Sequence, residues 1–208
     1  MQYKFNEKFF DNIDTVEKAY WIGFCWCDGY LSHRVRKGCE SFDFKLSLSE
    51  IDLEHLNKFK DKLESNHEIK LYDLKNGAFE TNNREARLLI CNKYFGKNIF
   101  YKYGLIPHRY EIDKLVNNIP YEFYKYFIRG VIDAEGCIFL KDVEFIKSSR
   151  KEFSLSITTY ENLLTFINNV FIKEGFTSTT YKLSQRHEGK DAHCKTLRIT
   201  GNNIVSKI

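Results

Sequence analysis

Ile128-Arg-Gly-Val-Ile-Asp-Ala-Glu-Gly136 is the most informative stretch of the chain, because a related stretch, Trp21-Ile-Gly-Phe-Cys-Trp-Cys-Asp-Gly29, precedes it by about half the chain length. Each stretch is an apolar run with an internal glycine, and each ends in an acid followed by a second glycine. The acids Asp28 and Glu135 lie 107 residues apart (from 28 to 135) in a chain of 208. The sequence is therefore duplicated, and each half should form one copy of the same structural unit.

An alternating segment follows each acid and predicts a strand with one face in the core and one in solvent. In both halves the apolar residues occupy every second position, with polar residues between them. The inward side chains are expected to be Phe42, Phe44, Leu46, Leu48, Phe153, Leu155 and Ile157. The outward ones in the second half are expected to be Ser154, Ser156 and Thr158.

Each half continues with an amphipathic helix, two more strands and the start of a third helix. With a short strand directly after each acid, both halves have the order α-β-β-α-β-β-α. We therefore divide the chain into a first repeat (1–105), a linker (106–119) and a second repeat (120–208). The later strands are expected at about 69–75, 84–91, 178–186 and 195–200, and the third helices from about Asn92 and Asn202.

Both apolar runs carry a glycine at the same place, Gly23 and Gly130. A glycine inside a helix costs about 1 kcal/mol relative to alanine. Its physical use there is close approach to another backbone. One interpretation is two independent core helices that each tolerate a glycine. The duplication favours the other, in which the two helices pack on each other across a pseudo-two-fold axis.

Asp28 and Glu135 fall in the last turn of their helices, where the helix dipole disfavours a carboxylate by about 0.3–1 kcal/mol. Paired helices would also bring the acids together, and like charges raise each other's pKa. A divalent cation would reverse both effects. For one copy, a solvated helix end is the ordinary interpretation, but two matching copies favour a metal site. Gly29 and Gly136 are expected to end the helices in left-handed turns.

The composition fits a globular protein that is mildly basic, with a hydrophobic fraction of 43% and a net charge of +4. Such a charge permits nucleic-acid binding without requiring it. None of the 6 cysteines forms a C-x-x-C pair, which argues against the common zinc and redox motifs. We expect an intracellular protein (bacterial or phage-infected cytoplasm, or an organelle) that is neither secreted nor membrane-spanning.

The two stretches resemble the paired motifs of single-chain LAGLIDADG homing endonucleases. The second copy is close to the family pattern, with Arg129 as the outlier; the first is looser, with Trp26 and Cys27 where the pattern has Asp and Ala. The order of elements also matches, so the resemblance covers almost the whole chain. It implies an α+β fold in which two repeats form a saddle of antiparallel sheets, with the motif helices packed at its centre.

The resemblance also implies an activity, namely site-specific double-strand cleavage of DNA that leaves short 3′ overhangs. Mg²⁺, with Mn²⁺ as a substitute, would be held by Asp28 and Glu135 and by backbone carbonyls near Cys27 and Ala134. The protein would act as a monomer on a long asymmetric site in duplex DNA. Family members also use a polar strand residue and a basic residue near the water, for which the matching positions here are Ser47, Ser156 and Arg109.

The outward strand faces are the expected site of DNA contact, because arginine and lysine can pair with guanine edges or phosphates. Each of these residues alone would be an ordinary solvated side chain, so the prediction applies to the set. The candidates are Ser32, Arg34, Arg36, Asp43, Lys45, Lys70, Tyr72, Arg84, Ser154, Lys182, Arg186, Thr196 and Arg198.

Two other functions belong to proteins of this type. Some are RNA-splicing maturases that bind their own intron, and others are DNA-binding regulators with decayed active sites. Retention of both acids argues against a regulator, because a pure binder has no use for two carboxylates near phosphates. It does not exclude a maturase.

The second repeat is expected to stop short of the first. At an offset of 109 residues, which pairs Ser47 with Ser156, Ile208 falls opposite Ile99, and nothing matches the rest of the first repeat's third helix. A helix of about two turns is not stable alone. We therefore expect a frayed C-terminus with an exposed apolar patch around Ile204 and Ile208.

Overall fold

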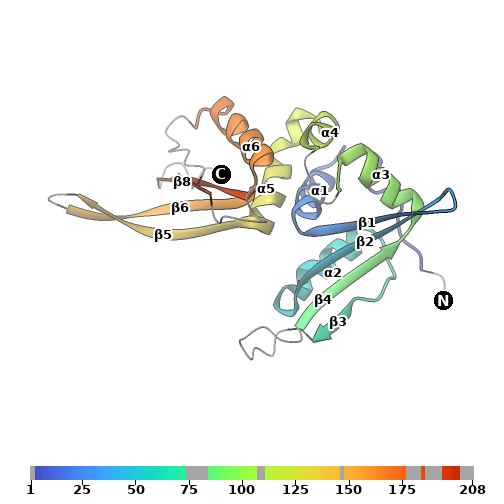
Figure 1. Cartoon of the computed structure of the whole chain (residues 1–208). Coiled ribbons are helices and arrows are strands. Elements are labelled where there is room, and N and C mark those ends of the chain that lie inside the picture. Colours follow the sequence, from blue (N-terminus) through green and yellow to red (C-terminus); the bar gives the residue numbers. More distant parts are fainter. Residues whose placement is uncertain are drawn as a thin grey trace. The chain divides into compact units, whose positions relative to one another are not determined.

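The computed structural model describes residues 3–73, 84–106, 111–145, 148–176, 184–185 and 194–201 (Figure 1). The chain divides into two compact units, Met1–Gly130 and Val131–Ile208, which we describe separately. The first unit contains α1 (Val16–Asp28), β1 (Gly29–Arg36), β2 (Cys39–Ser49), η1 (Glu50–Asp52), α2 (Leu53–Lys62), β3 (Lys70–Asp73), β4 (Arg84–Cys91), α3 (Lys93–Tyr103), α4 (Ile112–Asn117) and η2 (Tyr121–Phe123). Helix α5 (Tyr124–Glu135) crosses the boundary, and the second unit continues with β5 (Gly136–Phe145), β6 (Ser148–Tyr160), α6 (Glu161–Lys173), β7 (Ser184–Gln185) and β8 (Cys194–Thr200).

The first unit is built on an antiparallel sheet with strand order β1-β2-β4-β3. Phe42, Phe44 and Leu46 of β2 point into the core and are at most 2% exposed. Helices α1, α2 and α3 pack against this strand. The alternating pattern therefore places one apolar face of the sheet under helices, as predicted.

The second unit repeats this topology with strand order β5-β6-β8-β7, again antiparallel. Leu155 and Ile157 of β6 are buried, and α6 packs against β6 and β8. The prediction of two α+β repeats with antiparallel sheets is thus confirmed. No helix in the described part of the chain is long and apolar enough to cross a membrane.

The junction between each motif helix and its sheet differs from the prediction. Gly29 has φ −73° and ψ 147°, which is extended, so α1 passes into β1 without a left-handed turn. A Cβ on Gly29 would lie 2.2 Å from the Cys25 carbonyl oxygen, and one on Gly136 would lie 2.4 Å from that of Ile132. These glycines are therefore needed for space. The strands that follow are 8 and 10 residues long, and not short.

The expected linker, 106–119, contains helix α4, which packs against α3. The boundary between the compact units falls later, after Gly130 and inside α5. The reason is that the first half of α5 packs against α1 of the first unit. The linker is therefore part of the first unit's structure.

The two hairpins differ in register by two residues from the expected correspondence. Gly29 pairs with Leu46 in the first unit, whereas Gly136 pairs with Ile157 in the second. The residue after each partner is Ser47 in one case and Thr158 in the other. The expected match of Ser47 with Ser156 is therefore wrong, and Thr158 is the equivalent residue.

The core face of the second sheet is partly exposed. Phe153 is 44% exposed, although Phe42, which holds the same register position in the first unit, is 2% exposed. Ile138 and Leu140 on the same face are 59% and 56% exposed. Phe42 is covered by α3, whereas the expected third helix of the second repeat, with Ile204 and Ile208, lies outside the described residues.

Candidate active site and nucleic-acid interface

The motif glycines lie where two helices touch backbone to backbone. A Cβ on Gly23 would lie 2.2 Å from the Phe127 carbonyl oxygen, and one on Gly130 would lie 2.1 Å from that of Tyr20. All four residues belong to the first unit. At such distances no side chain fits, so helix α1 and the first half of α5 can pack this closely only with glycine at both positions.

Replacing Gly130 with alanine should therefore destabilise the protein by about 1–3 kcal/mol, because the new methyl group overpacks a contact made by backbone atoms. Alanine is the better helix former by about 1 kcal/mol, so the sign of the change reports which effect is larger. Urea unfolding would measure it, with Lys125→Ala on the exposed side of the same helix as a control within about 0.5 kcal/mol of wild type. A Gly130→Ala protein as stable as wild type would contradict the close packing.

The two motif acids are the last residues of their helices. Asp28 ends α1, Glu135 ends α5, and each is half-buried and followed directly by the first strand of a sheet. The last turn of either helix contains no basic residue. The negative end of each helix dipole therefore lies beside a carboxylate, and a bound cation would stabilise this arrangement.

The chemistry of these helix ends suits Mg²⁺. Carboxylates and backbone carbonyls are hard oxygen donors, which Mg²⁺ prefers, and it usually keeps several waters and takes only one or two carboxylates. Among the described residues, no group of three or more His, Cys, Asp or Glu side chains gathers at metal-binding spacing. Each helix end, with the carboxylate of Asp28 beside the Cys27 carbonyl or that of Glu135 beside the Ala134 carbonyl, therefore offers oxygen donors of the kind that Mg²⁺ takes.

In the first unit, a row of polar side chains crosses the sheet at the level of the acid. Ser47 follows the partner of Gly29 by one residue, so it lies at the strand position beside Asp28. Ser47 pairs with Arg87, and Arg87 pairs with Lys70. The last two side chains of this row, Arg87 and Lys70, are therefore both cationic.

The matching row of the second unit is neutral. Thr158, at the strand position beside Glu135, pairs with Thr196, and their hydroxyl oxygens lie 2.9 Å apart. Thr196 pairs in turn with Ser184. The two acids are thus accompanied by different chemistry, cationic in the first unit and hydroxyl in the second.

Arg87 is fixed by several contacts. Its Nη2 and Nε lie 3.0 and 3.1 Å from Glu85 Oε1, and its guanidinium carbon lies 4.3 Å from the centre of the Tyr72 ring. The nearby Ser47 hydroxyl and the Arg87 guanidinium hold the pKa of the Glu85 carboxyl below its ordinary value. The arginine side chain is still 30% exposed, so it can meet a ligand in a defined orientation.

Arg87 was missed from sequence, although the alternation of β4 contained the signal. Ala86 and Leu88 are buried, so Arg87 between them must face outward. Arg84, which was predicted to contact DNA, lies two positions before Ala86 and so points to the same side of the sheet as Ala86. Its Nε donates to Glu50 Oε2 at 2.8 Å. Arg84 therefore does not lie on the outward face.

The other predicted contacts of the first sheet share one face with Arg87, which we call the polar face. An ion pair joins Arg34 and Asp43, and the Lys45 ammonium lies 5.4 Å from the centre of the Tyr30 ring. Tyr30 was also missed from sequence and is 52% exposed. The register places on this face Tyr30, Ser32, Arg34, Arg36, Asp43, Lys45, Ser47, Lys70, Tyr72 and Arg87.

Two predicted contacts of the second sheet are not exposed. Ser154 is 0% exposed and its Oγ lies 2.8 Å from that of Thr200, while Thr196 is 8% exposed and shares its hydrogen bond with Thr158. Their expected exposure is wrong, because short hydroxyl side chains on adjacent strands bond to each other. Ser156 is half-buried.

Arg198 is the exposed cation in the described part of β8, and its guanidinium carbon lies 5.7 Å from the centre of the Phe139 ring. Three further predicted site residues, Arg109, Lys182 and Arg186, lie outside the described residues. The polar face is therefore the better defined of the two candidate interfaces.

Comparison with solved structures identifies the architecture. The chain is similar over 93% of its length, and 82% of the other chain, to the LAGLIDADG homing endonuclease I-LtrWI bound to target DNA, with a TM-score of 0.57 and 14% identity. It is similar over 90% of its length, and 80% of the other chain, to the meganuclease I-SmaMI bound to uncleaveable DNA (0.55, 16%) and to the LAGLIDADG meganuclease I-AabMI bound to uncleaved DNA (0.54, 14%). No family model matches the chain, and no curated protein matches it by sequence.

The fold is thus a duplicated α+β fold in which each unit places an acid at the end of a helix and the start of a sheet. It is the fold of the LAGLIDADG homing endonucleases, as the paired motifs predicted.

Proposed function

We propose that this chain is a site-specific endonuclease that hydrolyses both strands of duplex DNA with Mg²⁺, or Mn²⁺ in its place. The observation that carries the proposal is the placement of Asp28 and Glu135, two matched carboxylates at helix ends, each joined to a sheet. The similar solved proteins are bound to DNA, and one I-SmaMI structure was obtained in the presence of calcium ions. A divalent cation is therefore compatible with this fold.

When bound, metal ions would supply the activation of a water for in-line attack and the stabilisation of the leaving oxygen. Asp28 and Glu135 would supply the charged ligands, and the carbonyls of Cys27 and Ala134 would supply neutral ones. Close packing through Gly23 and Gly130 fixes the helix that ends at Asp28. Ser47 and Thr158, at the strand positions beside the acids, would orient the water by hydrogen bonds.

DNA would lie along the outward strand faces. A strand of about 10 residues spans about 33 Å, which matches about 10 base pairs. Two sheets would then cover about 20 base pairs, and because their outward residues differ, the site should be asymmetric. Both repeats belong to one chain, so a monomer would supply both halves of the interface.

Incubation with Mg²⁺ and randomised duplex DNA, followed by sequencing of the cut ends, would test this function. We expect one recurrent long asymmetric site, cut on both strands to leave short 3′ overhangs. Duplex binding without cuts in any duplex would instead indicate a regulator, and binding of structured RNA without cuts would indicate a splicing maturase. Either outcome would overturn the proposal.

The unequal rows beside the acids predict unequal nicking of the two strands. Replacing Arg87 with alanine should slow the cut of one strand by about 10- to 150-fold, because a charge-assisted hydrogen bond to a phosphate contributes about 1.5–3 kcal/mol. Arg87→Lys should recover part of that rate. Duplexes carrying a different end label on each strand would measure both rates, with Arg84→Ala, which removes an arginine from the opposite side of the same strand, as the matched control. Equal slowing of both strands would contradict the asymmetry.

A further inference from the structure

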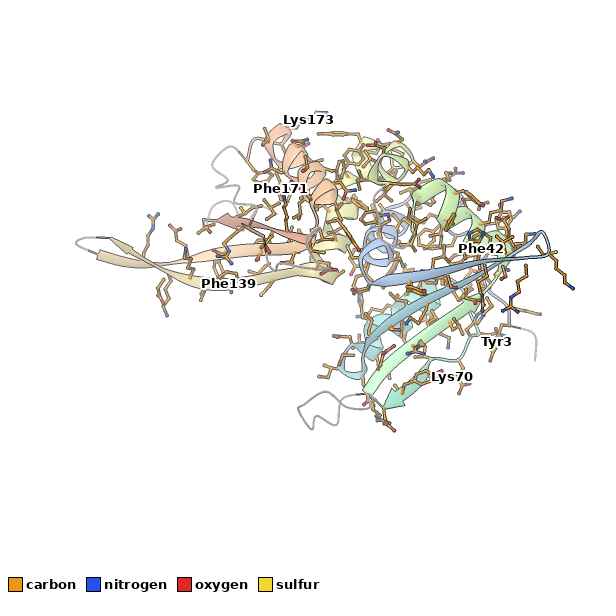
Figure 2. All side chains as sticks on the ribbon, viewed as in Figure 1. Tyr3, Phe42, Lys70, Phe139, Phe171 and Lys173 are labelled. Carbon is orange, nitrogen blue, oxygen red and sulfur yellow. The ribbon has the colours of Figure 1, made fainter. Side chains whose placement is uncertain are left out.

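A hollow of about 390 Å³ opens in the first unit, between the N-terminal segment and the outer strands of the sheet. Its lining includes Tyr3, His67, Glu68, Lys70, Tyr72 and Leu89. Tyr3 and Lys70 lie at the same edge of the unit (Figure 2). The register puts Lys70, Tyr72 and Leu89 on the polar face, so the hollow opens beside the surface proposed to bind nucleic acid.

Part of the lining of the hollow is a pair of stacked aromatic rings. The Tyr3 and His67 rings lie 4.5 Å apart at an interplanar angle of 14°. His67 is buried, and its Nδ1 lies 2.8 Å from Ser65 Oγ. Burial, with a smaller contribution from Lys60, lowers the pKa of His67, which favours the neutral form of the ring.

The segment that carries Tyr3 is tied to the body of the unit. The Lys4 amide donates to Asn66 Oδ1 at 2.7 Å, the Asn66 amide donates to the Lys4 carbonyl at 3.0 Å, and the Asn6 amide donates to the Leu63 carbonyl at 2.8 Å. Tyr3 is nevertheless 47% exposed. Its ring is therefore held in place while much of its surface remains open to a ligand.

Three features of the hollow define the ligand. Two partly exposed aromatic rings in the lining, Tyr3 and Tyr72, suit a flat π-system. Glu68 provides a carboxylate that can accept from an exocyclic amino group, and the Lys70 ammonium suits a nearby phosphate. A planar base attached to a phosphate is a nucleotide, and its base can enter a pocket only when it is not stacked within a duplex.

We propose that this hollow binds an unpaired nucleobase of a DNA or RNA strand that lies on the polar face. The proposal rests on the proposed nucleic-acid binding by that face, but not on cleavage. Base stacking on protein aromatics tolerates any base. The contact would therefore add affinity for a single-stranded tail, bulge or loop without adding sequence specificity.

The test compares the affinity of the whole protein, in EDTA, for a blunt duplex and for the same duplex with a single-stranded tail of about five nucleotides. A tail of DNA and a tail of RNA form separate arms, and 2-aminopurine in the tail reports stacking directly. Wild type should prefer at least one tailed duplex by about tenfold and should quench the 2-aminopurine. Tyr3→Ala should lose both effects and Tyr3→Phe should keep them, while Tyr121→Ala, which removes a tyrosine of similar exposure, should behave as wild type.

Equal wild-type affinity for blunt and tailed duplexes would overturn the proposal, as would a Tyr3→Ala protein that keeps the preference for a tail. Cleavage of blunt duplex with Mg²⁺, measured on the same samples, separates this result from the proposed function. If the protein cuts duplex DNA but shows no preference for tails, only the proposed base-binding pocket is overturned. If it binds tails through Tyr3 but never cuts DNA, the pocket is supported and the proposed nuclease activity is overturned.

Discussion

Asp28→Asn or Glu135→Gln is expected to reduce double-strand cleavage by about 10³-fold or more, while metal-free DNA binding persists. A bound metal ion contributes several kcal/mol to the transition state, and about 4 kcal/mol corresponds to 10³ in rate. Each substitution keeps the size of the side chain and removes one charged oxygen ligand. Removing a negative charge close to phosphates should, if anything, tighten binding in EDTA.

The control for this prediction lies in the same helix. Asp133 is an exposed acid two residues before Glu135, so Asp133→Asn removes the same charge without touching the helix end. Its cleavage rate should stay close to that of wild type. Filter binding in EDTA and cleavage in Mg²⁺ would be measured for all three variants. If Asp28→Asn or Glu135→Gln cuts DNA at the wild-type rate, the acid it replaces is not a metal ligand.

The duplication carried most of what could be predicted from the sequence. The matching glycines in the two motif helices predicted that these helices pack on each other, because a glycine within a helix is unfavourable unless two backbones meet there. The alternation of Phe42, Phe44 and Leu46 predicted the covered face of a sheet, and these side chains are buried. These are local patterns whose physical causes lie within a few residues.

The register of the second hairpin could not be obtained in this way. Side chains of a strand alternate with a period of two, so a shift of two residues leaves the same faces inward and outward. The sequence pattern is therefore identical whether Ser47 corresponds to Ser156 or to Thr158. Only the pairing of Gly136 with Ile157 separates the two, and that pairing is a contact across the hairpin.

Burial is equally hidden from a strand's own sequence. Ser154 looks outward by alternation but is buried beside a hydroxyl partner on another strand, Thr200. The deciding atom comes from a distant element, which alternation within β6 does not report. Arg84 differs in this respect, because alternation within β4 already puts it on the side of Ala86, where it pairs with Glu50.

Phe42 and Phe153 offer the clearest test of how contacts from distant elements affect stability. They hold the same register position in the two units but differ in how much of the side chain is buried. Phe42→Ala should lower the free energy of unfolding by about 3–5 kcal/mol, the usual cost of truncating a buried phenylalanine. Its ring contacts Phe100 of α3 with centroids 5.8 Å apart, and α3 comes so close at Gly96 that a Cβ there would lie 2.2 Å from Phe42 Cβ. Truncation would thus empty a closed space.

Phe153→Ala should cost about 1 kcal/mol or less, because a ring that is 44% exposed has transferred only part of its apolar surface from water. Urea unfolding of both variants, followed by the same signal and fitted with a common slope, would give the two values. A cost for Phe153→Ala that equals that of Phe42→Ala would mean that the face formed by Ile138, Leu140 and Phe153 is covered in solution. A small cost, with the large one at Phe42, would show that matched positions in the two repeats contribute unequally to stability, because of the two only Phe42 lies under a helix within the described part of the chain.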